Sequence, residues 1–319
     1  MNEKMLNQNF LNVLSEVFPK KKILVNEIAN TLDLDKISIY RRLNGFTSFK
    51  TDEIGILAKK YNISLDKALN MHSPNSMEMN LDIFHTIEDI DYEVLEKQLS
   101  FLEQLASQPD SEMGGVFYTY PITLFSPYEH LLKYHWFVWK HYYDQKSINQ
   151  RYESIEIPSK LMEYNHIGYE MYKNIKYTYY IWKTDLTSRL IKDLKYFESI
   201  HLISPESIRQ IKDELYQGLD RMEEKTNDGK ISKKGNKFEI YLCDLNVNKT
   251  ELYMWSEKMS SYTIPIFGPH RINSTDKEAC TVARRWIQRM RGASILISES
   301  AEKEKIQFFK KQREELKEL

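Results

Sequence analysis

The sequence predicts a mainly α-helical protein: an N-terminal domain of five short helices, a long helical region and a small α+β unit at the C-terminal end. Glycine and proline, which the turns of a β protein require, number only 10 and 9 in 319 residues. Charged residues make up 29% of the chain, a proportion that favours helices. The hydrophobic fraction of 41% is ordinary for a globular protein, so a substantial core is expected.

The N-terminal helices are predicted from the spacing of apolar residues and from the residues that end helices. Pro19 ends the first helix, and Asp33 separates the second from the third. Gly45 stands where the third helix needs a residue that tolerates a positive φ angle, and Ser64 is expected to cap the fifth. The helices are expected over residues 5–18, 25–32, 36–44 and 52–61, and over a short segment that contains Leu65 and Leu69, which closes a domain at residues 1–72.

A polar segment broken by Pro74 marks the predicted domain boundary. It gives a linker over residues 73–80 and a second domain over 81–319, helical over 81–230 and α+β over 236–319. Near the start of this domain, apolar residues repeat at intervals of three and four. This stripe either pairs two subunits as a short coiled coil or belongs to the core. Its members are Tyr92, Leu95, Leu99, Leu102 and Ala106.

The middle of the second domain is predicted to be helical from its apolar periodicity. Tyrosine and tryptophan are concentrated between Tyr118 and Trp182, and this aromatic-rich region is either plain core or the lining of a ligand cavity. Helices are expected over residues 128–143, 158–175, 186–199 and 205–225.

The C-terminal part is predicted to contain three antiparallel strands, over residues 238–242, 251–255 and 262–267. The first two are expected to be joined across residues 246–248. Pro265 has no backbone N–H to donate, so the third strand is placed at a sheet edge. A helix over 275–290, a strand over 294–297 and a charged helix from Ala301 complete this unit.

Two short helices around a tight turn, the second carrying Lys36, Arg41 and Arg42, are typical of a helix-turn-helix that presents a probe to the DNA major groove. The segment resembles the Cro/C1-type (XRE) helix-turn-helix family. The resemblance is carried by Ile28-Ala29, where the family has a Leu-Ala pair, by Leu34 and Ile39 at its buried positions, by Leu43-Asn44-Gly45 at the helix end, and by residues 54–66 as its closing pattern.

The resemblance covers residues 5–71 and implies a five-helix, lambda-repressor-like fold that binds double-stranded DNA. It implies base contacts by Lys36, Ser38 and Arg41, because Arg and Lys donors match the guanine acceptors of the major groove. A preference for G·C pairs in each half-site is therefore expected, and an A·T-only motif would contradict it. Tyr40, Arg42 and Lys50 are placed for phosphate or flanking contacts.

The segment departs from the family pattern at two places. Asp33 stands where the family usually has glycine, although Asp tolerates the left-handed conformation better than most residues. Leu24-Val25 replaces the usual Thr-Gln pair, whose side chains cap the helix and hold a phosphate. That phosphate anchor is missing unless Asn26 or the Lys20–Lys22 run replaces it.

Outside this segment the sequence offers one basic cluster, Arg284, Arg285, Arg289 and Arg291, of which the first three are the candidate anion contacts. The cluster is either a solvated helix face, an anionic-effector site or a second contact to DNA phosphates. Glu163 with His166 and Glu198 with His201 have the spacing of di-iron bundles, but about one such pair is expected by chance. His130, His135 and His141 point in different directions around a helix axis and are not expected to share an ion.

No metal site, cofactor or catalytic site is predicted. The sequence contains no GxGxxG, GxxxxGK[ST], GxSxG or HExxH motif. Cys243 and Cys280 have no metal-ligand spacing, which fits a reducing cytosol. The N-terminus has no apolar signal segment, and no run is long enough to span a bilayer, so a cytoplasmic protein without membrane contact is expected.

The charge distribution favours a dimer. Residues 1–72 hold 11 Lys and Arg against 8 acidic residues, whereas the whole chain has a net charge of −1. An excess of about three charges provides only modest nonspecific affinity for DNA, so two copies are expected to bind together.

The sequence therefore predicts a cytoplasmic, homodimeric regulator of transcription that binds specific DNA sequences and is not an enzyme. Its large C-terminal domain is expected to dimerise and to sense a small-molecule or protein effector. The alternative is an interaction protein of phage-repressor or antitoxin type, whose C-terminal domain holds a protein partner. A closed, polar-lined cavity would favour a sensor, whereas a packed core with an exposed apolar groove would favour a protein partner.

Overall fold

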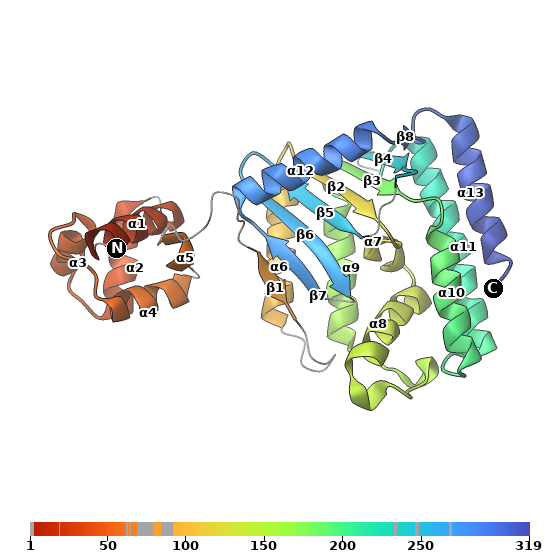
Figure 1. Ribbon diagram of the computed structural model, residues 1–319, viewed down its shortest axis with the longest axis horizontal. Helices are drawn as coiled ribbons and strands as arrows, with labels where there is room; N and C mark the ends of the chain where they lie inside the picture. Colours follow the sequence, from red (N-terminus) through yellow and green to blue (C-terminus); the bar gives the residue numbers. More distant parts are fainter. Residues whose placement is uncertain are drawn as a thin grey trace. The chain divides into compact units, whose positions relative to one another are not determined.

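The computed structural model divides the chain into an N-terminal unit, Met1–Met77, and a C-terminal unit, Glu78–Leu319 (Figure 1). The residues that it describes are 3–18, 20–61, 63, 65–68, 79–83, 92–232, 235–245, 249–267 and 270–319. The linker predicted over 73–80 lies outside the described residues except for its last two positions, as do Ser64 and Leu69.

The N-terminal unit consists of short helices around a single apolar core. Phe10, Leu14, Ile28, Ile39 and Leu57 are completely buried in it. Leu34, at the turn, is partly buried and packs against the same core. The helices are α1 (Glu3–Val17), α2 (Lys21–Leu32), α3 (Lys36–Leu43), α4 (Thr51–Tyr61) and α5 (Leu65–Ala68).

The C-terminal unit is built on one mixed sheet of eight strands in the order β1-β7-β6-β5-β2-β3-β4-β8. Strands β2, β3 and β4 are parallel to one another, and every other pairing is antiparallel. The strands are β1 (Asn80–Asp82), β2 (Glu112–Phe117), β3 (Tyr177–Trp182), β4 (Lys237–Leu242), β5 (Glu251–Trp255), β6 (Ser260–Phe267), β7 (His270–Ser274) and β8 (Ile295–Leu296).

Helices cover both faces of the sheet (Figure 1). Tyr180 and Trp182 of β3 point into the main core, while Tyr179 and Ile181 point to the opposite face, against α12. The α-helices of this unit are α6 (Tyr92–Ala106), α7 (Ile122–Phe125), α8 (Glu129–Tyr143), α9 (Ser159–Tyr172), α10 (Leu186–Ser199), α11 (Pro205–Asp228), α12 (Lys277–Gly292) and α13 (Glu302–Leu316), and two 3₁₀ turns cover Gln145–Ser147 and Tyr152–Ser154.

The predicted fold class, mainly α with a small α+β unit, is wrong. The protein is 59% helical and 15% strand, and its eight-stranded mixed sheet makes it an α/β protein. The central strands β2 and β3 escaped prediction because they are buried on both faces, which removes the alternation of polar and apolar residues that marks a half-buried strand. Gly114-Gly115 also lowers the strand propensity of β2.

The predicted pairing of the C-terminal strands is also wrong. Strand β4 pairs with β3 and β8, whereas β5 pairs with β2 and β6, so β4 and β5 are not neighbours. Strand β6 lies inside the sheet between β5 and β7 although it contains Pro265. The structure accommodates this proline at a shift in the β6–β7 register, between Pro265 and Phe267, where the regular hydrogen bonding is interrupted.

The apolar stripe on α6 is covered by its own chain. Leu95 packs against the cluster of Trp136 and Trp139, and Leu102 packs against the main core. The aromatic-rich region 118–182 is likewise packed core, since Trp139, Tyr152, Tyr180 and Trp182 are almost completely buried. Neither feature is therefore free to pair subunits or to line a large cavity.

Candidate nucleic-acid interface

A tight turn at Asp33 joins α2 to α3. Asp33 has φ 50° and ψ 48°, in the left-handed region, and its backbone N–H bonds to the Ala29 carbonyl. The N–H of Leu34 bonds to the same carbonyl at 3.1 Å. Aspartate enters this region at lower cost than most residues, so the turn forms without the glycine usual in such sequences.

Asp35 caps the start of α3 through Ser38. One Asp35 carboxylate oxygen accepts the Ser38 backbone N–H at 2.8 Å, and the other accepts the Ser38 hydroxyl at 2.6 Å. These two bonds lower the pKa of Asp35. The structure therefore engages the Ser38 hydroxyl, expected to contact bases, in holding the helix terminus.

The end of α3 is held by a Schellman motif. Gly45 has φ +76°, its N–H bonds to the Arg42 carbonyl at 3.0 Å, and the Phe46 N–H bonds to the Arg41 carbonyl at 2.9 Å. These bonds satisfy two carbonyls at the helix terminus, and the backbone angle explains the glycine at this position. With both ends capped, α3 has a defined length of two turns.

One face of α3 is buried and the other is exposed. Ile39 is completely buried, and Arg42 forms an ion pair with Glu53 of α4 through contacts of 2.9 and 3.1 Å. The outward face carries Lys36, Ile37, Tyr40 and Arg41, all exposed. Two cations, one aromatic hydroxyl and one aliphatic side chain therefore stand together on a short rigid helix.

Arg42 holds α3 against α4. Both side chains of the Arg42–Glu53 pair are only 14% exposed. Burial by itself would raise the pKa of Glu53, but hydrogen bonds from the Lys50 backbone N–H and the Arg42 guanidinium outweigh it and lower the pKa. Arg42, expected to contact phosphate, is thus occupied within the domain, whereas Lys50, directly before α4, is exposed.

Lys20, Lys21 and Lys22 surround the N-terminus of α2, and all three are exposed. Helix α2 has no acidic residue in its first turn and no side-chain cap. Lys21 donates to the Asn44 side-chain oxygen at 3.0 Å, which places this helix start beside the end of α3. Partial positive charge at a helix N-terminus and three ammonium groups make this an electropositive surface.

The structure reveals two exposed apolar side chains that the sequence reasoning missed. Ile37 is 73% exposed on α3, and Phe46, directly after the helix, is 76% exposed. Apolar residues at helical spacing are ordinarily assigned to the core, so these two carried no separate signal.

The three candidate anion contacts on α12 differ in their surroundings. Arg284 forms an ion pair with Glu112 and lies 4.8 Å from the centre of the Trp255 ring, so it is engaged within the fold. Arg285 and Arg289 are exposed. The structure therefore leaves two of the three predicted anion contacts on the surface.

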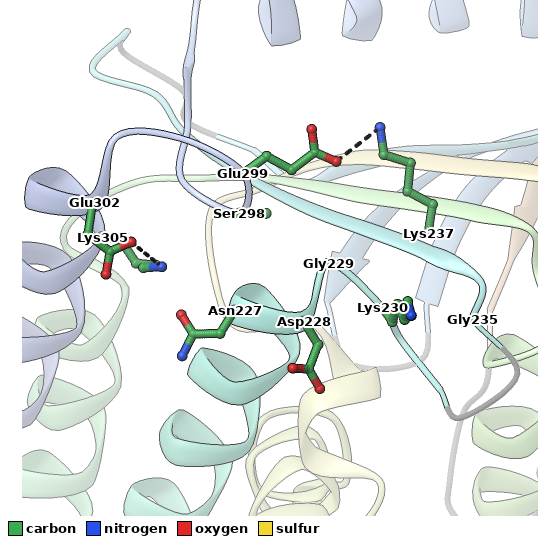
Figure 2. A pocket seen from close by; sticks show the side chains of 10 residues that line it. All are labelled: Asn227, Asp228, Gly229, Lys230, Gly235, Lys237, Ser298, Glu299, Glu302 and Lys305. Carbon is green, nitrogen blue, oxygen red and sulfur yellow. Dashed lines mark ion pairs between the residues drawn. The ribbon is translucent and has the colours of Figure 1, made fainter.

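An open cleft lies in the C-terminal unit, between the end of α11, the start of β4 and the start of α13 (Figure 2). It measures about 660 Å³ and is widely open to solvent. Two of its three lysines form ion pairs with its acids: Lys237 with Glu299, and Lys305 with Glu302. Its lining is Asn227, Asp228, Gly229, Lys230, Gly235, Lys237, Ser298, Glu299, Glu302 and Lys305.

The histidines noted in the sequence do not form a metal centre in the described part of the chain, where no group of three His, Cys, Asp or Glu side chains is placed to hold an ion. The ring of His130 instead hydrogen-bonds to Tyr152 at 3.2 Å, and His141 stacks on Phe137. Glu163 and His166 point to the surface.

Comparison with known proteins identifies no relative. No family model matches the chain, and neither a curated protein nor a solved structure matches it. Across the residues that the structure describes, none of the helices has the length and apolar character needed to cross a membrane. Functional inference therefore rests on the geometry of α2, α3 and their surroundings.

Proposed function

We propose that this protein is a sequence-specific, DNA-binding regulator of transcription that acts as a homodimer in the cytoplasm. The observation that carries the proposal is the exposed face of α3, with Lys36, Ile37, Tyr40 and Arg41 on a helix capped at both ends. A helix of this kind fits the major groove, where Arg and Lys match guanine and an aliphatic side chain matches the thymine methyl group.

The proposed contacts leave out two residues that were expected from the sequence, Ser38 and Arg42. Lys36, Ile37 and Arg41 read base edges, because the Ser38 hydroxyl is held by Asp35. Tyr40, Lys50 and the Lys20–Lys22 run contact phosphates, because the Arg42 guanidinium is held by Glu53. The lysine run takes the place of the missing phosphate anchor at Leu24-Val25.

The proposal is tested by the salt dependence of binding to duplex DNA. The full chain is titrated with a fluorescent duplex of random sequence at several salt concentrations. Each phosphate contact contributes about 0.9 to the slope of log affinity against log salt, so replacing Lys20, Lys21 and Lys22 by alanine should reduce the slope by about three. A matched triple replacement of the exposed Lys303, Lys310 and Lys311 on α13 should leave it unchanged. Equal effects of the two triple variants would contradict the proposal.

Arg285 and Arg289 are proposed as a second contact to DNA phosphate or to an anionic effector. Both are exposed and lie one turn apart on the same face of α12. Trp286, which follows Arg285 in the sequence, is 52% exposed. Alanine at both positions is expected to weaken binding of the full chain to DNA and to lower its salt slope. An unchanged affinity and slope would exclude the DNA role.

A second candidate function is an interaction protein of phage-repressor or antitoxin type, whose C-terminal unit holds a protein partner. The packed aromatic core and the openness of the cleft to solvent favour this over a small-molecule sensor. The described residues of the C-terminal unit also carry exposed apolar side chains, including Leu81, Ile83 and Trp286. A pull-down from cell extract tests for a protein partner, and a metabolite screen tests for a small effector.

A further inference from the structure

Strand β1 forms one edge of the sheet and leaves that edge apolar. Among the residues that the structure describes, it pairs with β7 alone. Met79, Leu81 and Ile83 alternate along this segment and are 37%, 56% and 51% exposed. Edge strands that must stay unpaired are usually protected by free charges, proline or a bulge. The single charge of β1, Asp82, is instead paired with Arg271 of β7 at 2.8 Å.

The exposed side chains of β1 continue an apolar row across the sheet. Leu81 is opposite Ile272 of β7, and Ile272 is opposite Ile264 of β6. Residues directly opposite in an antiparallel pair share a face, so these three side chains lie side by side. Helix α12 packs on β6, β5 and β2, and Figure 1 shows β7 and β1 at the border of the sheet beyond them.

We propose that this edge is where two copies of the chain associate, by antiparallel pairing of β1 with the partner's β1 about a twofold axis at Leu81. The pairing would join the two sheets into one and cover the apolar row at its most exposed point. This inference supplies the contact for the homodimer of the proposed function and rests on that proposal only for its biological role.

Charge selects the register of this pairing. Opposed residues must share a face, so neighbouring registers differ by two residues. With Leu81 opposite the partner's Leu81, Asp82 faces the partner's Asn80 and Met79 faces the partner's Ile83. Shifting the partner strand by two residues in either direction would place two acids opposite each other. In one direction Asp82 would be opposite the partner's Asp82, and in the other it would be opposite the partner's Glu78. Only the register at Leu81 avoids placing two acids opposite each other.

The position of β1 in the chain suits a DNA-binding dimer. Only the ten residues 69–78 separate α5 from Met79. Such a segment spans at most about 40 Å when fully extended. Two N-terminal units tethered to one β1 pair can therefore reach half-sites that are about 34 Å apart, one turn of the DNA helix.

The oligomeric state tests the proposal. Size-exclusion chromatography with light scattering should give a dimer for the full chain and a monomer for Leu81→Lys, because two lysines would be opposed at the axis. The matched control is Ile295→Lys in β8, at the opposite edge of the same sheet and 45% exposed, which should remain a dimer. A monomeric wild type, or a Leu81→Lys dimer, would overturn the proposal. Circular dichroism checks that each variant is folded.

A cysteine at the axis tests the register itself. Opposed residues of an antiparallel pair have Cα atoms about 4.5–5.5 Å apart, within the range that a disulfide bridges. Leu81→Cys should therefore form a covalent dimer on mild oxidation, while Ile295→Cys should not; Cys243 and Cys280 are buried and do not compete. Failure of Leu81→Cys to cross-link would refute the pairing. A cross-linked dimer that does not bind DNA would refute only the proposed function. DNA binding by a monomeric wild type would refute this inference and the homodimer of the proposed function, but not DNA binding by α3.

Discussion

Arg41 and Arg42 are adjacent on α3 but have different surroundings, and this divides their roles. Arg41 is exposed, whereas the Arg42 guanidinium is held by Glu53 and lies 5.8 Å from the centre of the Phe49 ring. An arginine held by a bidentate carboxylate positions its helix and has few donors left for a phosphate. The two residues therefore affect different properties of the protein.

We expect Arg42→Ala to lower the free energy of unfolding of the N-terminal unit by about 2 kcal/mol, because it leaves Glu53 partly buried without its charged donor. Arg41→Ala should leave that free energy unchanged and weaken binding to the preferred DNA sequence by about tenfold or more, the loss of one base contact. Urea unfolding and DNA titration of the two variants measure this. The same stability loss in both variants would contradict the division of roles.

Ile37 is expected to favour thymine at one position of each half-site, because its exposed side chain can pack against the thymine methyl group. Ile37→Ala should weaken the preference for thymine there by about fivefold, in line with the modest cost of one altered base contact. Binding to duplexes carrying thymine or uracil at that position isolates the methyl group. A wild-type protein indifferent to the methyl group would argue against this role.

At the scale of elements, the packing of α12 on the sheet depends on the glycine at the centre of β2. A Cβ atom at Gly114 would overlap the ring of Tyr179, which is buried on the neighbouring strand. The Tyr179 hydroxyl hydrogen-bonds to that of Tyr253 at 2.9 Å, and Tyr253 donates to Glu112, the partner of Arg284 on α12. Displacing the ring would therefore disturb the contact between sheet and helix.

Gly114→Ala should consequently destabilise the C-terminal unit by about 2 kcal/mol or more, the usual cost of overpacking a core. Chemical unfolding measures the loss. Gly292→Ala is the control, since a Cβ at Gly292 meets no neighbour within 4 Å. Combining Gly114→Ala with Tyr179→Ala should destabilise less than the sum of the two single changes, and strict additivity would show that the ring does not occupy this space.

Glu153 caps the start of α11, accepting the Ser204 backbone N–H and the Ser207 hydroxyl, both at 2.8 Å. Burial alone would raise the pKa of Glu153, but these hydrogen bonds outweigh it and lower the pKa to about 2. Because the folded pKa is depressed, the charged form stabilises the protein above the unfolded pKa, and that contribution is lost as the pH falls through the folded value.

The C-terminal unit should therefore lose stability between about pH 5 and pH 2 in part through this one residue. In Glu153→Gln this part of the pH dependence should be absent, with lower stability at pH 7 and a smaller difference from wild type at pH 2. Urea unfolding across this range measures it. Glu156→Gln, at an exposed glutamate nearby, should keep the wild-type profile. A wild-type profile in Glu153→Gln would contradict the cap.

Individual elements of this chain could be predicted where their periodicity is helical or their strand is half-buried. Helix α10 and strand β5 have the bounds that the sequence indicated, 186–199 and 251–255. The sheet as a whole could not be predicted, because β2 and β3 are buried on both faces and their pairing is set by contacts distant in the sequence. Spacing along the chain carries no information about which strands are neighbours.

The candidate interface was predictable in its backbone and less so in its side chains. The left-handed turn at Asp33 and the positive φ at Gly45 follow from local residue chemistry. The engagement of Ser38 and Arg42 depends on partners, one of them on another helix, and exposure of Ile37 depends on how α3 is rotated. Such properties emerge only when the helices pack.

At the scale of the whole molecule, the two units differ in the sign of their net charge. The excess of basic residues lies within residues 1–72, and the rest of the chain is acidic overall. One N-terminal unit therefore has little nonspecific attraction for DNA, and specific contacts on two copies must supply the affinity. The β1 pairing that we propose for the C-terminal unit would bring two copies together and so meet that requirement.

The most direct test of the central claim, that α3 reads a DNA sequence, is selection of binding sites from a random duplex pool by the full chain and by Arg41→Ala. We expect the wild type to enrich two half-sites containing G·C pairs, and Arg41→Ala to lose the preference at one pair in each half-site while keeping the rest. Enrichment of no motif, of an A·T-only motif, or of the same motif by both proteins would contradict it.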